Sequence, residues 1–205
     1  MTFNLRLLTA LTVLCGLCAC GGTPLIFDDA APFGPMSSDE VGLLTDGYDQ
    51  LSTEVLDIAP TPEGGVERAG GATFTGLAEL TISPDGDSDS MSLIGETVLI
   101  ANFETRAVTA TMFNFAGLDL SGGGQRLDGS LAMNDGSIGS FASNSVLGTF
   151  QGVLVGEDFE IVADGQLNGT FRDVPTSAIS FTGVDDTALI NSERAQLTLS
   201  GIAQD

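Results

Sequence analysis

Histidine, lysine and tryptophan are absent from this chain of 205 residues, and tyrosine occurs only once. Cysteine occurs three times, and all three cysteines lie within the first 20 residues, at Cys15, Cys18 and Cys20. The lack of imidazole excludes Cys–His and Ser–His nucleophilic catalysis, as well as zinc sites built from cysteine and histidine. What remains is carboxylate chemistry, metal sites made only of oxygen ligands, or no catalysis.

Positive charge is also scarce. The chain has 6 arginines against 28 acidic residues, which gives a formal net charge of −22. Nucleic acid and anionic lipid headgroups would be repelled, so we expect no nucleic-acid partner. With 42% hydrophobic residues the chain can bury a core, and the acidity then indicates a strongly solvated surface. An acidic face that attracts a cationic partner or metal ions is the alternative.

The N-terminus combines Arg6 with an apolar run over residues 7–19 and has no acidic residue. This pattern is typical of a secretory signal peptide, and the run is too short to span a bilayer. Its end, Leu17-Cys18-Ala19-Cys20, resembles the bacterial lipobox, which is cleaved just before a diacylated cysteine. Residues 1–19 would then be removed, and Cys20 would carry the lipid (palmitate) that holds the protein on a membrane. A plain secretory signal with a chance cysteine is the alternative.

Residues 20–69 are predicted to be a tether that contains one helix. Prolines at 24, 32 and 35 favour an extended leash over residues 20–36. No aspartate follows Cys20 directly, which in enteric bacteria would favour export to the outer membrane. Ser37-x-x-Glu40 is a capping-box pattern and predicts an amphipathic helix over about 38–58. Its apolar stripe is Leu44, Tyr48, Leu51 and Val55. We expect this stripe to pack on the next domain or to plug its open end, and a helix that binds a partner is the alternative.

Residues 70–205 show the short alternating segments that are typical of β-strands. In 72–82, for example, Phe74, Leu80 and Ile82 share one face, and Thr75 and Thr81 share the other. We expect turns at Glu104-Thr105, at 134–136 and at 164–165. The strands are predicted at 72–82, 93–103, 106–115, 126–133, 137–142, 145–155, 159–163, 166–172, 178–184 and 194–202.

This pattern predicts an all-β domain, a soluble antiparallel barrel of about eight strands with a filled interior. Glycines recur inside the strands, as at the bends of a small closed barrel. A membrane-spanning barrel would need aromatic girdles, and this chain has no tryptophan and a single tyrosine outside the strands.

The strand region resembles the β-barrel domain of transferrin-binding-protein-B-like surface lipoproteins. The resemblance covers roughly residues 70–205 and rests on 71–76, on the hairpin 101–111, and on 147–152 through 169–171. It departs from the family pattern in the loop 173–178 and at the C-terminal end 202–205. The resemblance implies a lipid-anchored barrel protein that binds an extracellular protein or an iron-carrying ligand.

An acidic loop supplies the candidate metal site. Asp85, Asp87 and Asp89 alternate along the loop, and Glu96 is the twelfth position counted from Asp85, which is an oxygen-rich spacing that calcium prefers. Ser90 stands where an EF-hand has glycine, so a solvated acidic hairpin loop is the alternative interpretation. The glycine run 122–124 lacks the helix that a phosphate-binding loop requires, and we expect no cofactor.

Together these features predict a lipid-anchored, cell-envelope binding protein of the bacterial outer membrane that is not an enzyme. The first alternative is a periplasmic structural or assembly lipoprotein with no small-molecule ligand. The second is a hydrolase that uses two convergent carboxylates, for which no spacing in the sequence singles out a pair.

Overall fold

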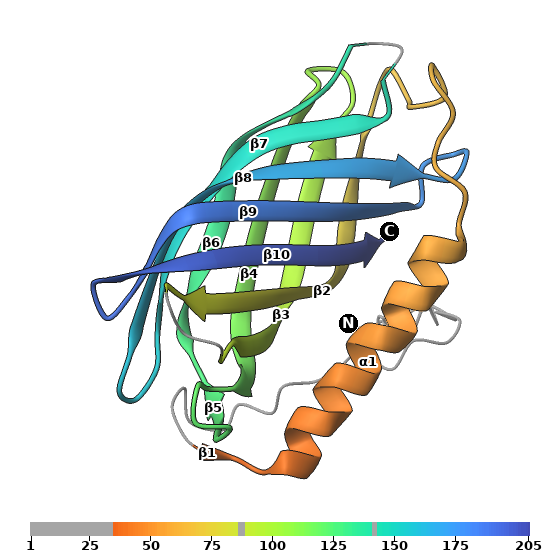
Figure 1. Ribbon diagram of the computed structural model, residues 1–205. Helices are drawn as coiled ribbons and strands as arrows, with labels where there is room; N and C mark the ends of the chain where they lie inside the picture. The colour runs from red at the N-terminus through yellow and green to blue at the C-terminus, as the bar shows by residue number, and fades with distance from the viewer. Residues whose placement is uncertain (1–34, 86–88, 141–142) are drawn as a thin grey trace, which may run out of the picture.

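The computed structural model describes residues 35–85, 89–140 and 143–205, which form one helix and a closed antiparallel barrel (Figure 1). Eight strands make the barrel in the order β2-β3-β4-β6-β7-β8-β9-β10, and β10 pairs with β2 to close it. The all-β prediction is therefore confirmed. The barrel strands are β2 (Gly71–Pro84), β3 (Met91–Asn102), β4 (Ala107–Leu118), β6 (Asp128–Ile138), β7 (Ser145–Val155), β8 (Glu160–Arg172), β9 (Ala178–Ile190) and β10 (Glu193–Gln204).

The barrel interior is filled by the apolar half of each alternating strand. In β2, Phe74, Leu80 and Ile82 are completely buried, as the sequence predicts. A single core cluster runs through the barrel and includes Phe115 of β4 and Phe150 of β7. Burial of this apolar surface is the main force that favours the folded state.

Two short strands lie outside the barrel. β1 (Pro35–Met36) pairs with β5 (Gly124–Arg126), and β5 pairs in turn with the end of β4. Pro35 and Met36 belong to the predicted extended tether, whereas in the structure they are attached to the barrel through their pairing with β5. The remaining part of the predicted tether before Pro35, together with the signal segment, lies outside the described residues.

The helix α1 (Ser38–Asp57) lies diagonally across the outer wall of the barrel (Figure 1). Its capping box is formed as predicted, because Ser37 Oγ accepts the Glu40 amide hydrogen and the Glu40 carboxylate accepts that of Ser37. The apolar stripe packs on side chains that point outward from the strands, Leu77 and Ile202 among them. Of the two expected roles, α1 therefore has the first, packing on the barrel rather than plugging it.

Two predicted turns are wrong. The glycine-containing sequences 134–136 and 164–165 lie inside the continuous strands β6 and β8, next to register shifts. A Cβ atom on Gly136 would lie 2.5 Å from the Val108 carbonyl oxygen, and one on Gly165 would lie 2.6 Å from the Phe150 ring. These glycines allow close approach of a neighbouring strand or ring instead of reversing the chain.

One end of the barrel is covered by the segment that follows α1, at residues 59–70. The Thr61 amide donates to the Phe171 carbonyl oxygen at 2.9 Å, and Asn144 Nδ2 donates to the Thr61 carbonyl oxygen at 2.6 Å. Val66 joins the barrel core beneath this segment. Residues 59–69 belong to the predicted tether, but these contacts make the segment a cover for this end.

Candidate functional site

The sequence-predicted site residues are only partly described by the structure. Cys20 and Asp87 lie outside the described residues. Glu96 pairs with Leu77 in the register between β2 and β3, eight residues along β2 from Asp85. At about 3.3 Å per residue this separates Glu96 from Asp85 by roughly 25 Å, so the register does not bring them together.

Glu96 also has a local partner, because Asn114 Nδ2 donates to its carboxylate at 3.3 Å. Within residues 35–85, 89–140 and 143–205, no group of three or more histidine, cysteine, aspartate or glutamate side chains is arranged to hold a metal ion. A calcium site in the loop that carries Asp85 and Asp89 stays a prediction.

The clearest candidate site is a pocket in the barrel end opposite to the covered one. We call this end the mouth; it carries the connections β2–β3, β4–β6, β7–β8 and β9–β10. The pocket has a volume of about 340 Å³, which is within the range of small-molecule sites in proteins. It is lined by Pro84, Met91, Asp119, Leu120, Ser121, Gln125, Asp158, Phe159, Ile190, Asn191 and Glu193.

The floor of the mouth pocket is the end of the barrel core. Met91 and Ile190 are buried members of that core, and Leu120 and Phe159 pack against it while remaining partly accessible. Fixed apolar floors of this kind bind the hydrocarbon part of a ligand.

One wall of the pocket is built around Asp119. One of its carboxylate oxygens accepts hydrogen bonds from the Ser121 amide, the Ser121 hydroxyl and the Gly123 amide, at 2.7–2.9 Å. The other oxygen accepts from Gln125 Nε2 at 2.5 Å. Desolvation tends to raise the pKa of Asp119, but these hydrogen bonds outweigh it and lower the pKa below its ordinary value.

The side-chain carbonyl oxygen of Gln125 is buried and unpaired among the described residues. Because its Nε2 is held by Asp119, its carbonyl oxygen Oε1 is the free end of the amide. That oxygen is buried and has no hydrogen-bond partner among the described residues. Buried acceptors are nearly always paired, so this oxygen is unusual, but it is closed off from solvent and does not open into the pocket.

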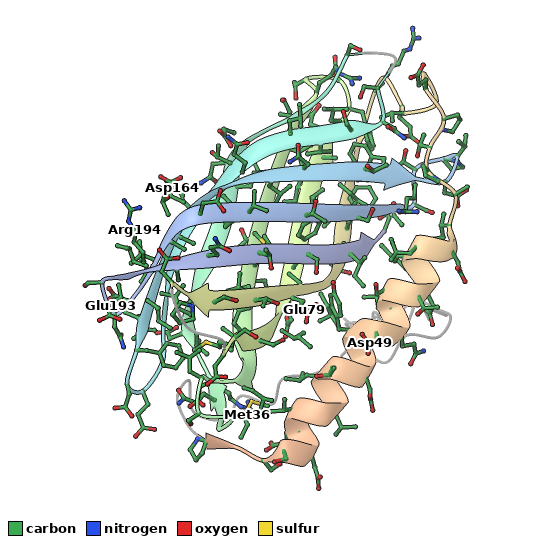
Figure 2. All side chains as sticks on the ribbon, in the orientation of Figure 1. Met36, Asp49, Glu79, Asp164, Glu193 and Arg194 are labelled. Carbon is green, nitrogen blue, oxygen red and sulfur yellow. The ribbon has the colours of Figure 1, made fainter. Side chains whose placement is uncertain are left out.

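The opposite wall carries the remaining carboxylates, Asp158 and Glu193. Asn191 joins the two hairpins that bear them, since its Oδ1 accepts the Glu160 amide hydrogen at 2.9 Å and its Nδ2 donates to the Asp158 carbonyl oxygen at 3.4 Å. Figure 2 shows Glu193 at the start of β10, at this end of the barrel. Neither carboxylate is part of a sequence motif, and the sequence analysis did not single out either one; the only available signal was that each lies just before a predicted strand.

A second cavity, of about 280 Å³, lies between α1 and the outer wall of β8, β9 and β10. Its polar lining is neutral and rich in hydroxyl groups, including those of Tyr48, Ser52 and Thr182. The Tyr48 and Ser200 hydroxyl oxygens lie 2.7 Å apart here, so part of the lining is engaged in holding the helix to the barrel.

No protein-family model matches this sequence, and no curated protein matches it significantly. Among solved structures, the chain is similar to a double mutant of the vaccine antigen transferrin-binding protein B from Haemophilus parasuis Hp5. The identity is 10%, the TM-score is 0.49, and the match covers 71% of this chain. The same match covers only 27% of the length of the transferrin-binding protein chain. The similarity concerns the barrel fold at most and does not show that this chain belongs to that family.

Proposed function

We propose that this protein is a lipid-anchored protein of the bacterial outer membrane that binds a ligand, without catalysis, at the mouth of its barrel. The observation that carries the proposal is the mouth pocket, which joins an apolar floor to the polar side chains of Asp119, Asp158 and Glu193. The lipobox-like sequence ending at Cys20 supports attachment to the membrane. An extracellular protein or an iron-carrying ligand is the kind of partner that the sequence resemblance implies.

The path of the chain is consistent with membrane attachment on the mouth side. Pro35 and Met36 pair with Gln125 and Gly124, and Gln125 lines the pocket. The 14 residues 21–34 separate Cys20 from this point and can span at most about 50 Å. Among the described residues, no helix has both the length and the apolarity needed to cross a bilayer.

Lipid attachment is tested by metabolic labelling with palmitate. We expect label on the wild-type protein and on Cys18→Ser, and no label on Cys20→Ser. Cys18→Ser is the matched control, because it removes a thiol from the same segment while leaving Leu17, Ala19 and Cys20 intact. Equal labelling of Cys20→Ser would reject the proposed anchor.

Exposure is tested by treating intact cells with protease. Cleavage of the barrel domain would agree with a binding protein on the outer surface. Cleavage only after the outer membrane has been opened would instead indicate a periplasmic protein. A deletion strain with a weakened envelope would then favour a structural or assembly role.

A further inference from the structure

The apolar floor of the mouth pocket remains partly open to solvent. Leu120 and Phe159 pack against the barrel core but stay partly accessible, and Met91 and Ile190 are buried members of that core. Covering accessible apolar surface in a pocket of about 340 Å³ is favourable. An apolar side chain that is held next to this floor would therefore be drawn onto it.

The described part of the chain begins beside this pocket. In the pairing of β1 with β5, Pro35 lies opposite Gln125 and Met36 lies opposite Gly124. Gln125 lines the pocket, whereas Met36 belongs to the apolar cluster beneath α1. Directly opposed residues of antiparallel strands share one face. Pro35 therefore lies on the face of β1 that is directed to the mouth pocket, and Met36 lies on the face that is directed to α1.

Phe33, which lies outside the described residues, precedes Pro35 by two positions. Because side chains of an extended chain alternate between two faces, Phe33 would share the pocket face with Pro35. Gly34 stands between them, and a residue that precedes a proline is biased towards an extended backbone. At no more than about 3.6 Å per residue, the Cα atoms of Phe33 and Pro35 are separated by at most about 7 Å. The phenyl ring is therefore within reach of the pocket.

Charge favours Phe33 over Phe27, the other aromatic residue of the tether before Pro35. Phe27 is followed directly by Asp28 and Asp29, which the carboxylates on both walls of the pocket would repel. Phe33 instead lies in an uncharged stretch, residues 30–34. Phe33 thus fits the mouth in reach, in the face that it occupies and in the charge of its neighbours.

We propose that Phe33 occupies the mouth pocket, where its ring covers Leu120 and Phe159, and that the tether thereby closes the mouth. A ligand that binds at the mouth, as in the function proposed above, has to displace Phe33 first. The tether and the ligand then compete, which lowers the apparent affinity for the ligand. This competition rests on the proposed function, whereas the docking of Phe33 does not.

Tryptophan fluorescence tests the docking, because the chain has no tryptophan of its own. Each variant is purified as the full chain with Cys20→Ser, so that no lipid is attached there and no detergent is needed. We expect the emission of Phe33→Trp to lie at shorter wavelength than that of Phe27→Trp, and to move to longer wavelength in urea. Phe27→Trp is the matched control, since it places the same indole in the same tether. Equal emission from the two native variants would overturn the proposal.

Variants of the pocket show where residue 33 docks. In the Phe33→Trp chain, Leu120→Glu should move the emission to longer wavelength, because it places a charge on the pocket floor. Val174→Glu is the matched control, since Val174 is an exposed apolar residue between β8 and β9 that does not line the pocket. Circular dichroism checks that both variants keep the barrel. No shift with Leu120→Glu, or an equal shift in the control, would reject docking on this floor.

Competition is measured with Nile red, a neutral dye whose fluorescence rises on apolar surfaces. We expect Phe33→Ala to bind Nile red about tenfold more tightly than the Cys20→Ser parent, and Phe27→Ala to bind it like the parent. Equal binding by Phe33→Ala and the parent would reject closure of the mouth by Phe33, while the mouth would stand as a binding site. If no variant binds the dye, the proposed function at the mouth fails, and the emission of Phe33→Trp still decides whether the tether docks.

Discussion

Tyr48 and Ser200 are 152 residues apart in the chain, and their hydroxyl oxygens lie 2.7 Å from each other. The contact joins the middle of α1 to the outer face of β10, and Tyr48 is buried beneath the helix. Because the chain has one tyrosine and no tryptophan, tyrosine fluorescence reports on this interface alone.

We expect Tyr48→Phe to lower the free energy of unfolding by about 1 kcal/mol, because it removes the hydrogen bond to Ser200 and leaves the ring in place. Urea unfolding followed by circular dichroism would measure the change. A double-mutant cycle with Ser200→Ala isolates the pair, and strictly additive effects would show that the two hydroxyls do not interact. In the wild-type protein, coincident fluorescence and circular dichroism transitions would mean that helix and barrel unfold together.

The same tyrosine gives stability a dependence on alkaline pH. Burial raises the pKa of Tyr48 above its ordinary value of about 10, the hydrogen bond with Ser200 opposes this, and the charges of Glu79 and Asp49 raise it further. Since the native pKa is above the unfolded one, the contribution of this group to stability is full below pH 10. It is lost as the pH rises through the native pKa.

Tyrosinate absorbance measures this titration directly, because only one tyrosine contributes. We expect a midpoint above that of the urea-unfolded chain. A midpoint in the native protein equal to the unfolded one would contradict the burial of the hydroxyl under α1.

Arg172, on strand β8, donates hydrogen bonds to backbone carbonyl groups at the C-terminal end of α1. The last turn of α1 has no basic residue of its own, and Arg172 in β8 donates to the carbonyl oxygens of Ile58 at 2.7 Å and Leu56 at 3.3 Å. It also donates to Ser180 Oγ at 3.1 Å. A cation at this position satisfies terminal carbonyl groups and complements the helix dipole.

We expect Arg172→Ala to lower the free energy of unfolding by about 2 kcal/mol, since hydrogen bonds from a charged donor are lost. Arg194→Ala is the matched control, because Arg194 is exposed on β10 and should change stability by less than about 0.5 kcal/mol. Thermal unfolding of both variants would measure these two changes in stability. Equal effects would show that the contacts between Arg172 and the helix end contribute nothing.

Gly201 and Gly42 should respond in opposite directions to replacement by alanine. A Cβ atom on Gly201 would lie 2.1 Å from the Phe181 ring inside the barrel, whereas one on Gly42 in α1 would meet nothing within 4 Å. We expect Gly201→Ala to destabilise the protein by about 3 kcal/mol through overpacking. Gly42→Ala should stabilise it by about 0.5–1 kcal/mol through helix propensity. Denaturant midpoints compare the two directly, and a stabilising Gly201→Ala would contradict the packing described for Phe181.

The sequence patterns predicted elements with a regular period well. The capping box at Ser37 and Glu40 located the start of α1, and alternation in β2 identified its inward face. Leu77 breaks that alternation because it is apolar and points outward, and only the position of α1 over it explains why. Period-two patterns cannot contain this information, since the helix that covers Leu77 is formed by a separate segment.

The turn predictions at 134–136 and 164–165 failed for a related reason. Glycine next to aspartate is a turn signal when only local conformation is considered. In the barrel, the Phe150 ring of the neighbouring strand lies so close to Gly165 that there is no room for a side chain at this position. The local sequence does not show this contact. The mouth pocket was missed because Gln125, Asp158 and Glu193 are far apart in the chain and meet only once the barrel has closed.

The position of β1 determines how the protein would carry a mechanical load. A pull on the chain before Pro35 acts first on the two-residue pairing of β1 with β5 and then on the N-terminal end of α1. None of these elements belongs to the eight strands that close the barrel. β1 and α1 would therefore detach from the barrel one after the other. The force would act on the pairing of β2 with β10 only after both have detached.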